Sequence, residues 1–155
     1  MWELNWFNLW KLSKEKFWKE YPLILAITDE YVEKYKSTVE KHKYINLYAL
    51  MLAVRKQENG REGLEFGVMA AKDTDLEEQA RWAIVTFIKN IQRWERAIRD
   101  NSWKRTNSSL ELDYIAFLGN RWCPVGAAND PLGLNRHWIP NVQQLYNLYK
   151  KEVIR

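Results

Sequence analysis

Residues 51–68 read MLAVRKQENGREGLEFGV, and this stretch decides how the rest of the chain is interpreted. Three apolar residues, Leu47, Met51 and Val54, are spaced by four and three positions. The carboxylate of Glu58 follows four positions after Val54. Residues at these spacings share one face of a helix, so an apolar stripe ending in a carboxylate is expected on a helix from about residue 44 to residue 58. Asn59-Gly60 is a strong helix stop signal. The glycines that follow predict a loop or short β-hairpin over residues 59–73.

Outside this stretch the chain is expected to be mainly α-helical. Apolar residues at helical spacing predict further helices over residues 2–20, 22–35, 74–98, 108–119 and 142–153, with 74–98 as the central core helix. Thr74 to Glu77 and Ser108 to Glu111 have the spacing of capping boxes. Residues 120–137 are rich in Gly, Pro, Asn and Asp and are expected to be irregular, and His42 is expected to be solvated.

The composition indicates one globular domain over residues 1–155. Hydrophobic residues make up 46% and charged residues 28%, and the net charge of +4 is mixed in sign, without the dense basic block typical of nucleic-acid binding. Nine Trp contribute to an aromatic content of 14%. Two interpretations stay open for these rings: a groove for ring-shaped ligands such as sugars, or a Trp-rich core with an N-terminal packing surface.

Several kinds of site and segment are not expected. The single cysteine, Cys123, is interpreted as a buried structural thiol rather than a nucleophile. His42 and His137 lack metal-ligand spacing, and no phosphate loop or dinucleotide fingerprint is present, so we expect neither metal nor cofactor. The N-terminus lacks the apolar core of a signal peptide, and no run of 18 apolar residues predicts membrane insertion.

Glu58 is the candidate catalytic residue. A carboxyl group held against apolar side chains at the edge of a core has its ionised form disfavoured, so its pKa rises. Such a group stays protonated near neutral pH and can donate its proton to a glycosidic oxygen. The competing interpretation is a terminal Glu that turns to solvent.

Two segments resemble the lysozyme superfamily, and most closely its lytic transglycosylases and glucosaminidase-like phage or bacterial domains. The first is a helix ending in Glu58-Asn-Gly, followed by the Gly-apolar motif Phe66-Gly67-Val68. The second comprises residues 113–130, DYIAFLGNRWCPVGAAND, and 134–142, LNRHWIPNV. The resemblance covers residues 44 to 146; it implies a lysozyme-like core over residues 44–155, with residues 1–43 as a helical extension.

The resemblance implies cleavage of peptidoglycan glycan strands with Glu58 as the acid. A hydrolase needs a second carboxylate, for which Glu65 is the first candidate, before Glu62 and Asp73, whereas a transglycosylase uses a hydroxyl of the sugar itself. Met69-Ala70-Ala71 stands where those families have a Gln, so the choice between the two reactions stays open.

The remaining expectations concern partners. Aromatic, amide and guanidinium groups are expected to contact substrate: Phe66, Tyr114, Asn120, Arg121, Trp122, Asn129 and Trp138. An alternative for residues 120–138 is a loop bonded to itself. We expect a monomer that binds peptidoglycan rather than nucleic acid and that a phage or a secretion machine delivers to the wall. A different class of function is a non-catalytic lysozyme-like interaction protein of a phage or secretion system.

Overall fold

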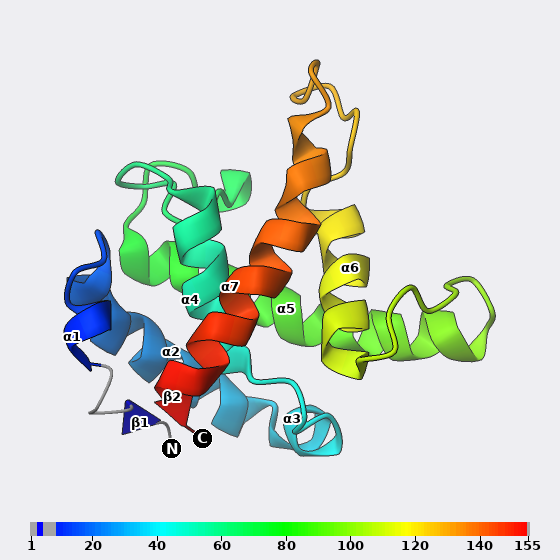
Figure 1. The fold of residues 1–155 in the computed structure, drawn as a ribbon, viewed down its shortest axis with the longest axis horizontal. Helices are drawn as coiled ribbons and strands as arrows, with labels where there is room; N and C mark the ends of the chain where they lie inside the picture. The colour runs from blue at the N-terminus through cyan, green and yellow to red at the C-terminus, as the bar shows by residue number, and fades with distance from the viewer. Residues whose placement is uncertain (1–2, 5–8, 155) are drawn as a thin grey trace.

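The computed structural model describes residues 3–4 and 9–154, with side chains from residue 11 to residue 153, and it confirms the mainly α-helical class (Figure 1). The helices are α1 (Leu9–Leu12), α2 (Tyr21–Lys34), α3 (Lys36–Lys41), α4 (Leu47–Glu58), α5 (Leu76–Arg99), α6 (Leu110–Trp122) and α7 (Trp138–Glu152). Short 3-10 turns are η2 (Trp18–Glu20), η3 (Met69–Ala71) and η4 (Leu134–His137). Strands β1 (Glu3–Leu4) and β2 (Val153–Ile154) pair antiparallel and join the two ends of the chain.

Helix α4 is the innermost helix. Every residue from Leu47 to Arg55 is buried, and α7, α2 and α5 pack around it. In Figure 1, α4 and α7 run side by side through the middle of the molecule. The helix predicted over residues 74–98 forms as α5, but it is not the central helix: it is long and amphipathic, and it buries only one side. The prediction was wrong because α4 carries apolar residues on all its sides.

The helix termini differ from the predicted capping boxes by one residue. The side chains of Asp75 and Ser109 accept hydrogen bonds from the amides of Glu78 and Leu112, so these two residues are the N-caps of α5 and α6. Thr74 is occupied elsewhere, since its hydroxyl donates to the carbonyl of Ala71. For α4, the start lies at Leu47, because the side chain of Asn46 caps the amide of Ala49.

The predicted helix over residues 2–20 does not form, and of its tryptophans Trp2 and Trp6 lie outside the described residues. Among the described residues of this segment are β1, the single turn α1 and the turn η2. Leu12 and Phe17 are nevertheless buried in the same hydrophobic core as the later helices, a core that extends to Val153. A continuous helix would place these two residues five positions apart, on different sides, whereas the observed turns bring both onto the core.

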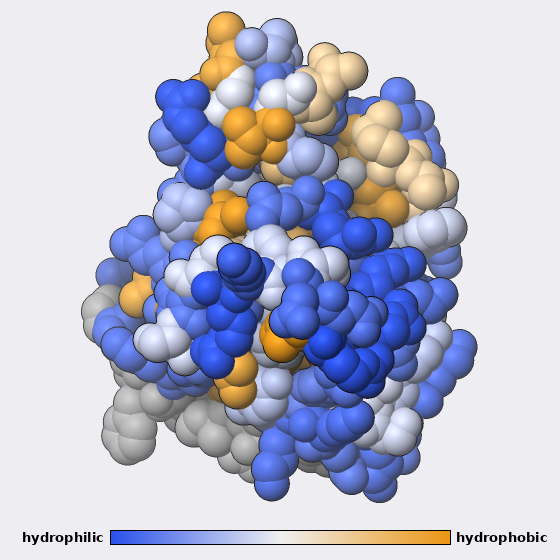
Figure 2. Space-filling model, turned by 90° about the vertical axis from the view of Figure 1, so that its right-hand side faces the viewer, coloured by the Kyte–Doolittle hydropathy of each residue, from blue (hydrophilic) through white to orange (hydrophobic). Residues whose placement is uncertain are grey.

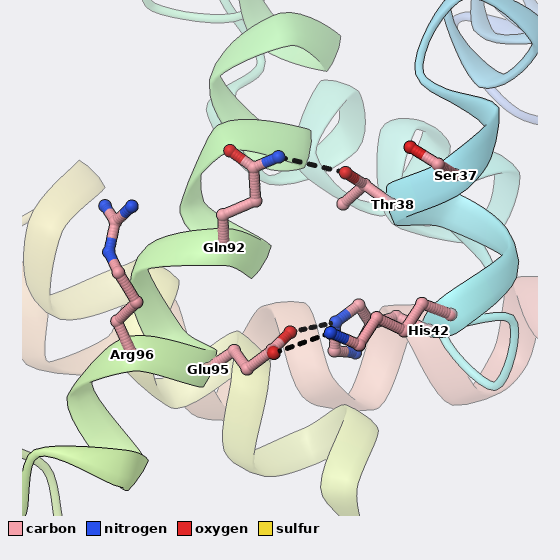
Figure 3. A pocket seen from close by; sticks show the side chains of 7 residues that line it. Ser37, Thr38, His42, Gln92, Glu95 and Arg96 are labelled. Atoms are coloured by element: carbon pink, nitrogen blue, oxygen red, sulfur yellow. Dashed lines mark hydrogen bonds and ion pairs between the residues drawn. The ribbon is translucent and has the colours of Figure 1, made fainter.

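His42 is buried, which corrects the expectation that it is solvated. Its Nε2 lies 2.6 Å from a carboxylate oxygen of Glu95, and its Nδ1 lies 3.0 Å from the hydroxyl of Tyr44. Figure 3 shows the bonded side chains of His42 and Glu95, which both line a hollow between α3 and α5. Polar groups buried between helices are stable when they bond one another, and the sequence did not reveal this pairing 53 residues apart.

Within the described residues, no helix is both long enough and apolar enough to span a membrane.

Candidate functional site

Glu58 is the last residue of α4, as the sequence predicts. The next residue, Asn59, adopts a left-handed conformation with φ of 47°, which ends the helix and turns the chain into the loop over residues 60–68. The side chain of Glu58 is half-buried rather than turned out into solvent. The apolar stripe of α4 therefore ends in a carboxyl group at the boundary of the core.

Two indole groups hold one oxygen of this carboxyl. The Nε1 of Trp122, at the end of α6, donates to Oε1 of Glu58 at 2.9 Å, and the Nε1 of Trp138, at the start of α7, donates to the same oxygen at 3.0 Å. An indole nitrogen can only donate, so Oε1 remains an acceptor in either protonation state of Glu58. A proton carried by this group is therefore placed on Oε2.

Burial raises the pKa of Glu58 above its ordinary value, and the hydrogen bonds from Trp122 and Trp138 oppose this effect only in part. Desolvation penalises the charged carboxylate, whereas donated hydrogen bonds stabilise it. The net result favours the neutral acid, the form that can donate a proton.

The second oxygen, Oε2, faces Gly67. A Cβ at this position would lie 2.8 Å from Oε2, and Gly67 has φ of +71°, so a side chain here would be strained and would press on the carboxyl group. Gly67 itself is exposed. Glycine thus allows the loop backbone to pass close to Oε2 without a side chain that would clash with the carboxyl group.

Gln79, on α5, fixes the loop on both sides of Gly67. Its side-chain oxygen accepts from the amides of Phe66 and Val68, both at 3.1 Å, and its Nε2 donates to the carbonyls of Gly63, Val68 and Ala71. Gln79 was not among the predicted site residues. The sequence pattern that could have indicated Gln79 is its position four residues before Ala83, in line with the apolar stripe of α5. A Gln on that stripe is completely buried and therefore needs several hydrogen-bond partners.

Arg55 fixes the same loop from α4 and was also missed. It is only 2% exposed, and its guanidinium donates to the carbonyls of Gly60 and Glu65 and to the carboxylate of Glu20. The ring of Phe17 lies against it, 3.6 Å from ring centroid to guanidinium carbon. A buried charge is stable when it is paired and hydrogen-bonded, and here those partners are the N-terminal segment and the loop.

The three candidate second carboxylates have different surroundings. Glu62 and Asp73 are exposed, and Asp73 pairs with Arg61 at 2.9 Å. Glu65 is 4% exposed, and its Oε1 is buried without a hydrogen-bond partner among the described residues. An unpaired buried oxygen is costly, which makes Glu65 the unusual member of the three.

The structure brings Trp122 and Trp138 to Glu58, as hydrogen-bond donors to the carboxyl group. Trp138 is only 3% exposed, so its expected contact with a ligand is wrong. Trp138 reaches it because Gly119 allows close packing of α6 on α7, where a Cβ would meet Trp138 at 2.9 Å. Gly119 was expected to end the helix over residues 108–119, but α6 continues through it to Trp122. Its role is close helix approach rather than termination.

The expected contacts of Phe66 and Tyr114 with a ligand are wrong. Both side chains have no exposed surface, and the Tyr114 hydroxyl donates to the carbonyl of Phe87 inside the core. From sequence alone, an aromatic residue on a helix or in a tight loop can be assigned to the core or to a binding surface. The tertiary packing determines which of the two it occupies.

The segment between Trp122 and Trp138 projects from the body of the molecule (Figure 1) and is bonded to itself. Buried Asp130 accepts from the amides of Gly126, Leu134 and Asn135. The expected contact residues Asn120, Arg121 and Asn129 are exposed in or beside this segment. Figure 2 shows apolar surface gathered on the upper part of the molecule, where the segment lies, and its exposed large apolar residues are Val125, Leu132 and Leu134.

The Cys123 thiol is half-buried next to this site. Burial, with the nearby charges of Glu58 and Asp130, raises its pKa to about 11, so it stays a neutral thiol rather than a thiolate nucleophile.

Among the described residues, no group of three His, Cys, Asp or Glu side chains is placed to hold a metal ion. Comparison of the chain with family models, curated proteins and solved structures finds no match.

Proposed function

We propose that this chain cleaves the glycan strands of bacterial peptidoglycan, with Glu58 as the general acid. The observation that carries the proposal is the environment of Glu58: a half-buried carboxyl with raised pKa, one oxygen held by two indoles and the other beside Gly67, where a Cβ would press on it. The resemblance of residues 44–146 to the lysozyme superfamily supports the same assignment. On this proposal the chain is a monomer that a phage or a secretion machine delivers to the wall.

The proposed reaction uses the proton on Oε2. Glu58 gives this proton to the glycosidic oxygen as the bond from that oxygen to the anomeric carbon breaks, and the bonding electrons stay with the leaving sugar. The resulting Glu58 carboxylate then takes a proton from the attacking group. In a hydrolase this group is water, and in a transglycosylase it is a hydroxyl of the cleaved sugar.

Glu65 is the proposed second carboxylate of the hydrolytic version. Its carbonyl is held by Arg55, and it lies in the loop that also carries Gly67. The exposed residues Asn120, Arg121 and Asn129 are the proposed substrate contacts.

The test compares isosteric variants on purified peptidoglycan. Glu58→Gln should lower the rate of turbidity loss by roughly 10²- to 10⁴-fold, the usual contribution of a general acid. Glu62→Gln, at an exposed carboxylate in the same loop, should keep the wild-type rate. Equal clearing by wild type and Glu58→Gln would remove Glu58 from this role.

Glu65→Gln separates the two reactions. It should abolish activity in a hydrolase and leave it largely intact in a transglycosylase. Mass spectrometry of the released muropeptides provides the independent readout, because anhydro ends identify the transglycosylase and reducing ends the hydrolase. If the wild type acts on no wall type, the alternative of a non-catalytic interaction protein replaces the proposal.

A further inference from the structure

A pocket lies between α2 and α5, and none of its lining residues belongs to the Glu58 site. It has a volume of about 300 Å³ and is lined by Tyr31, Glu78, Arg81, Trp82, Val85 and Lys89. Four of the five α5 residues, Glu78, Trp82, Val85 and Lys89, recur every three or four positions, and Arg81 lies beside Trp82, so the five form one side of that helix. Its size falls at the lower end of the roughly 300–1,000 Å³ of small-ligand pockets. We call it the Trp82 pocket.

Trp82 provides an accessible ring in this pocket. It is 46% exposed, and its indole nitrogen makes no hydrogen bond within the described residues. Most tryptophans bury their large apolar surface, so a ring left in solvent at the edge of a pocket is available for a ligand. An indole offers an apolar face and, at its edge, one hydrogen-bond donor.

The other wall of the pocket is held rigidly. Arg81 donates to both carboxylate oxygens of Glu30 at 2.8 Å and to Glu77 at 2.8 Å, and its guanidinium lies 5.8 Å from the centroid of the Tyr31 ring. Arg81 is therefore occupied by its own protein. A wall fixed in this way loses little conformational entropy when a ligand binds.

Lys89 is the cation left available in the pocket. Its ammonium group is exposed and makes no ion pair within the described residues. The hollow between α3 and α5 also has an exposed cation, Arg96, that makes no ion pair within the described residues, but its lining includes no Trp, Tyr or Phe. Its other polar groups bond one another: Gln92 bonds Thr38, and Glu95 bonds both Lys41 and His42 (Figure 3). Polar groups that satisfy one another offer less to a ligand than a free indole and a free ammonium.

An amino-sugar ring that carries an acidic substituent matches this arrangement. A sugar ring has a face of C–H groups that can lie on an indole, and hydroxyl or acetamido oxygens at its edge that can accept from the indole nitrogen. A carboxylate on the substituent pairs with an ammonium group. In peptidoglycan, the lactyl and peptide carboxylates are such substituents.

We propose that the Trp82 pocket is a second glycan-binding site, which holds an N-acetylated amino-sugar of the wall polymer on Trp82 and its acidic substituent on Lys89. This inference rests on the proposed function, because it takes the same polymer as ligand. The site binds and does not react. Its effect is to retain the protein on insoluble wall while Glu58 acts on another part of the polymer.

The experiment measures co-sedimentation of the full chain with insoluble purified peptidoglycan. All variants carry Glu58→Gln so that the polymer stays intact during binding. Adding Trp82→Ala should weaken binding roughly three- to tenfold, which is the range expected for one ring contact. Lys89→Ala should also weaken binding, and Trp82→Phe should restore most of it. Trp18→Ala, which removes another exposed tryptophan, is the matched control and should bind as the parent does.

The outcomes separate this inference from the proposed function. With Glu58 intact, Trp82→Ala should cleave short soluble glycan fragments at the wild-type rate, which also shows that the variant is folded. Unchanged sedimentation of Trp82→Ala overturns the second site and leaves the role of Glu58 untouched. A shift from dimer to monomer in Trp82→Ala during analytical ultracentrifugation also overturns it, because the occupant is then a second copy of the chain.

Discussion

The two oxygens of the Glu58 carboxyl group have different surroundings, and this difference is the central feature at the residue scale. Oε1 receives both indole hydrogen bonds, whereas Oε2 faces the backbone of Gly67. Since the indoles fix the orientation of the group, its proton is directed to one side. Gly67 lies on that side, and its lack of a side chain keeps Oε2 free of a clash there.

Gly67→Ala should therefore impair activity more than stability. The new Cβ would lie 2.8 Å from Oε2, and the left-handed backbone would cost about 1–2 kcal/mol. We expect activity on peptidoglycan to fall at least roughly tenfold, since small displacements of a catalytic group have large effects on rate.

Gly126→Ala is the matched control for this change. Gly126 has φ of +76°, close to that of Gly67, but a Cβ there would meet nothing within 4 Å. Both variants should lose the stability that a left-handed Ala costs, and Gly67→Ala should lose somewhat more because of the contact with Oε2, but only Gly67→Ala should lose activity. Equal activity of the two variants would show that the space beside Oε2 is not used.

At the scale of elements, the end of α4 and its following loop are held by the N-terminal segment. Glu20 and Phe17 contact Arg55, which in turn holds the loop, and Lys16 donates to Asn59 at 3.2 Å. Glu15 pairs with Lys56 at 3.1 Å. The segment over residues 11–20 is thus a structural support for the candidate site, in addition to burying its own apolar residues.

Deleting residues 1–20 should destabilise the protein strongly. Loss of the buried Leu12 and Phe17 alone should cost roughly 3–6 kcal/mol at about 1.5–3 kcal/mol per side chain. Calorimetry should show a Tm lower by about 10 °C or more. A truncated chain as stable as the full chain would mean that the segment serves a partner instead.

A narrower change tests the same contact. Glu20→Gln removes the charge facing the buried Arg55 and should cost about 1–3 kcal/mol. Glu40→Gln is its control, because Glu40 pairs with Lys36 at 4.0 Å on the surface, and it should change stability by no more than about 0.5 kcal/mol.

At the scale of the whole molecule, two Trp-bound carboxylates affect stability in opposite ways. Asp113 accepts from the indoles of Trp94 and Trp103 and from the amide of Thr106. Burial alone would raise the pKa of Asp113, but these hydrogen bonds outweigh it and the pKa is lowered. For Glu58, burial prevails and the pKa is raised.

The pH dependence of stability follows from these directions. Ionised Asp113 stabilises the fold above its unfolded pKa of 3.8, and this contribution is lost as pH falls through the lower folded pKa. Ionised Glu58 destabilises the fold, because its folded pKa is raised. This loss of stability is absent below the unfolded pKa of 4.5, and it reaches its full size once the pH has risen through the higher folded pKa.

Glu58→Gln should therefore be more stable than wild type near pH 7, by roughly 0.5–2 kcal/mol, with an advantage that shrinks towards about pH 4. Asp113→Asn should be less stable near neutral pH, with a deficit that shrinks in acid. Urea unfolding across the pH range measures both. Parallel curves for wild type and Glu58→Gln would contradict the raised pKa.

Periodicity and turn chemistry are local properties, and they determined a large part of this protein. They predicted the α-helical class, the end of α4 at Glu58, the irregular loop beyond it and, within one residue of Tyr21, the start of α2. The stop signal at Asn59 acts within one helical turn, so sequence alone suffices to place it.

Only the tertiary structure decided what surrounds Glu58. Trp122 and Trp138 lie 64 and 80 residues away, and which face each indole presents depends on how closely α6 and α7 pack at Gly119. The same holds for Gln79, Arg55 and His42, whose buried polar groups find partners distant in sequence. Spacing along the chain indicates which residues lie on the same face of a helix. Their burial and hydrogen bonds depend on which other helices pack against that face.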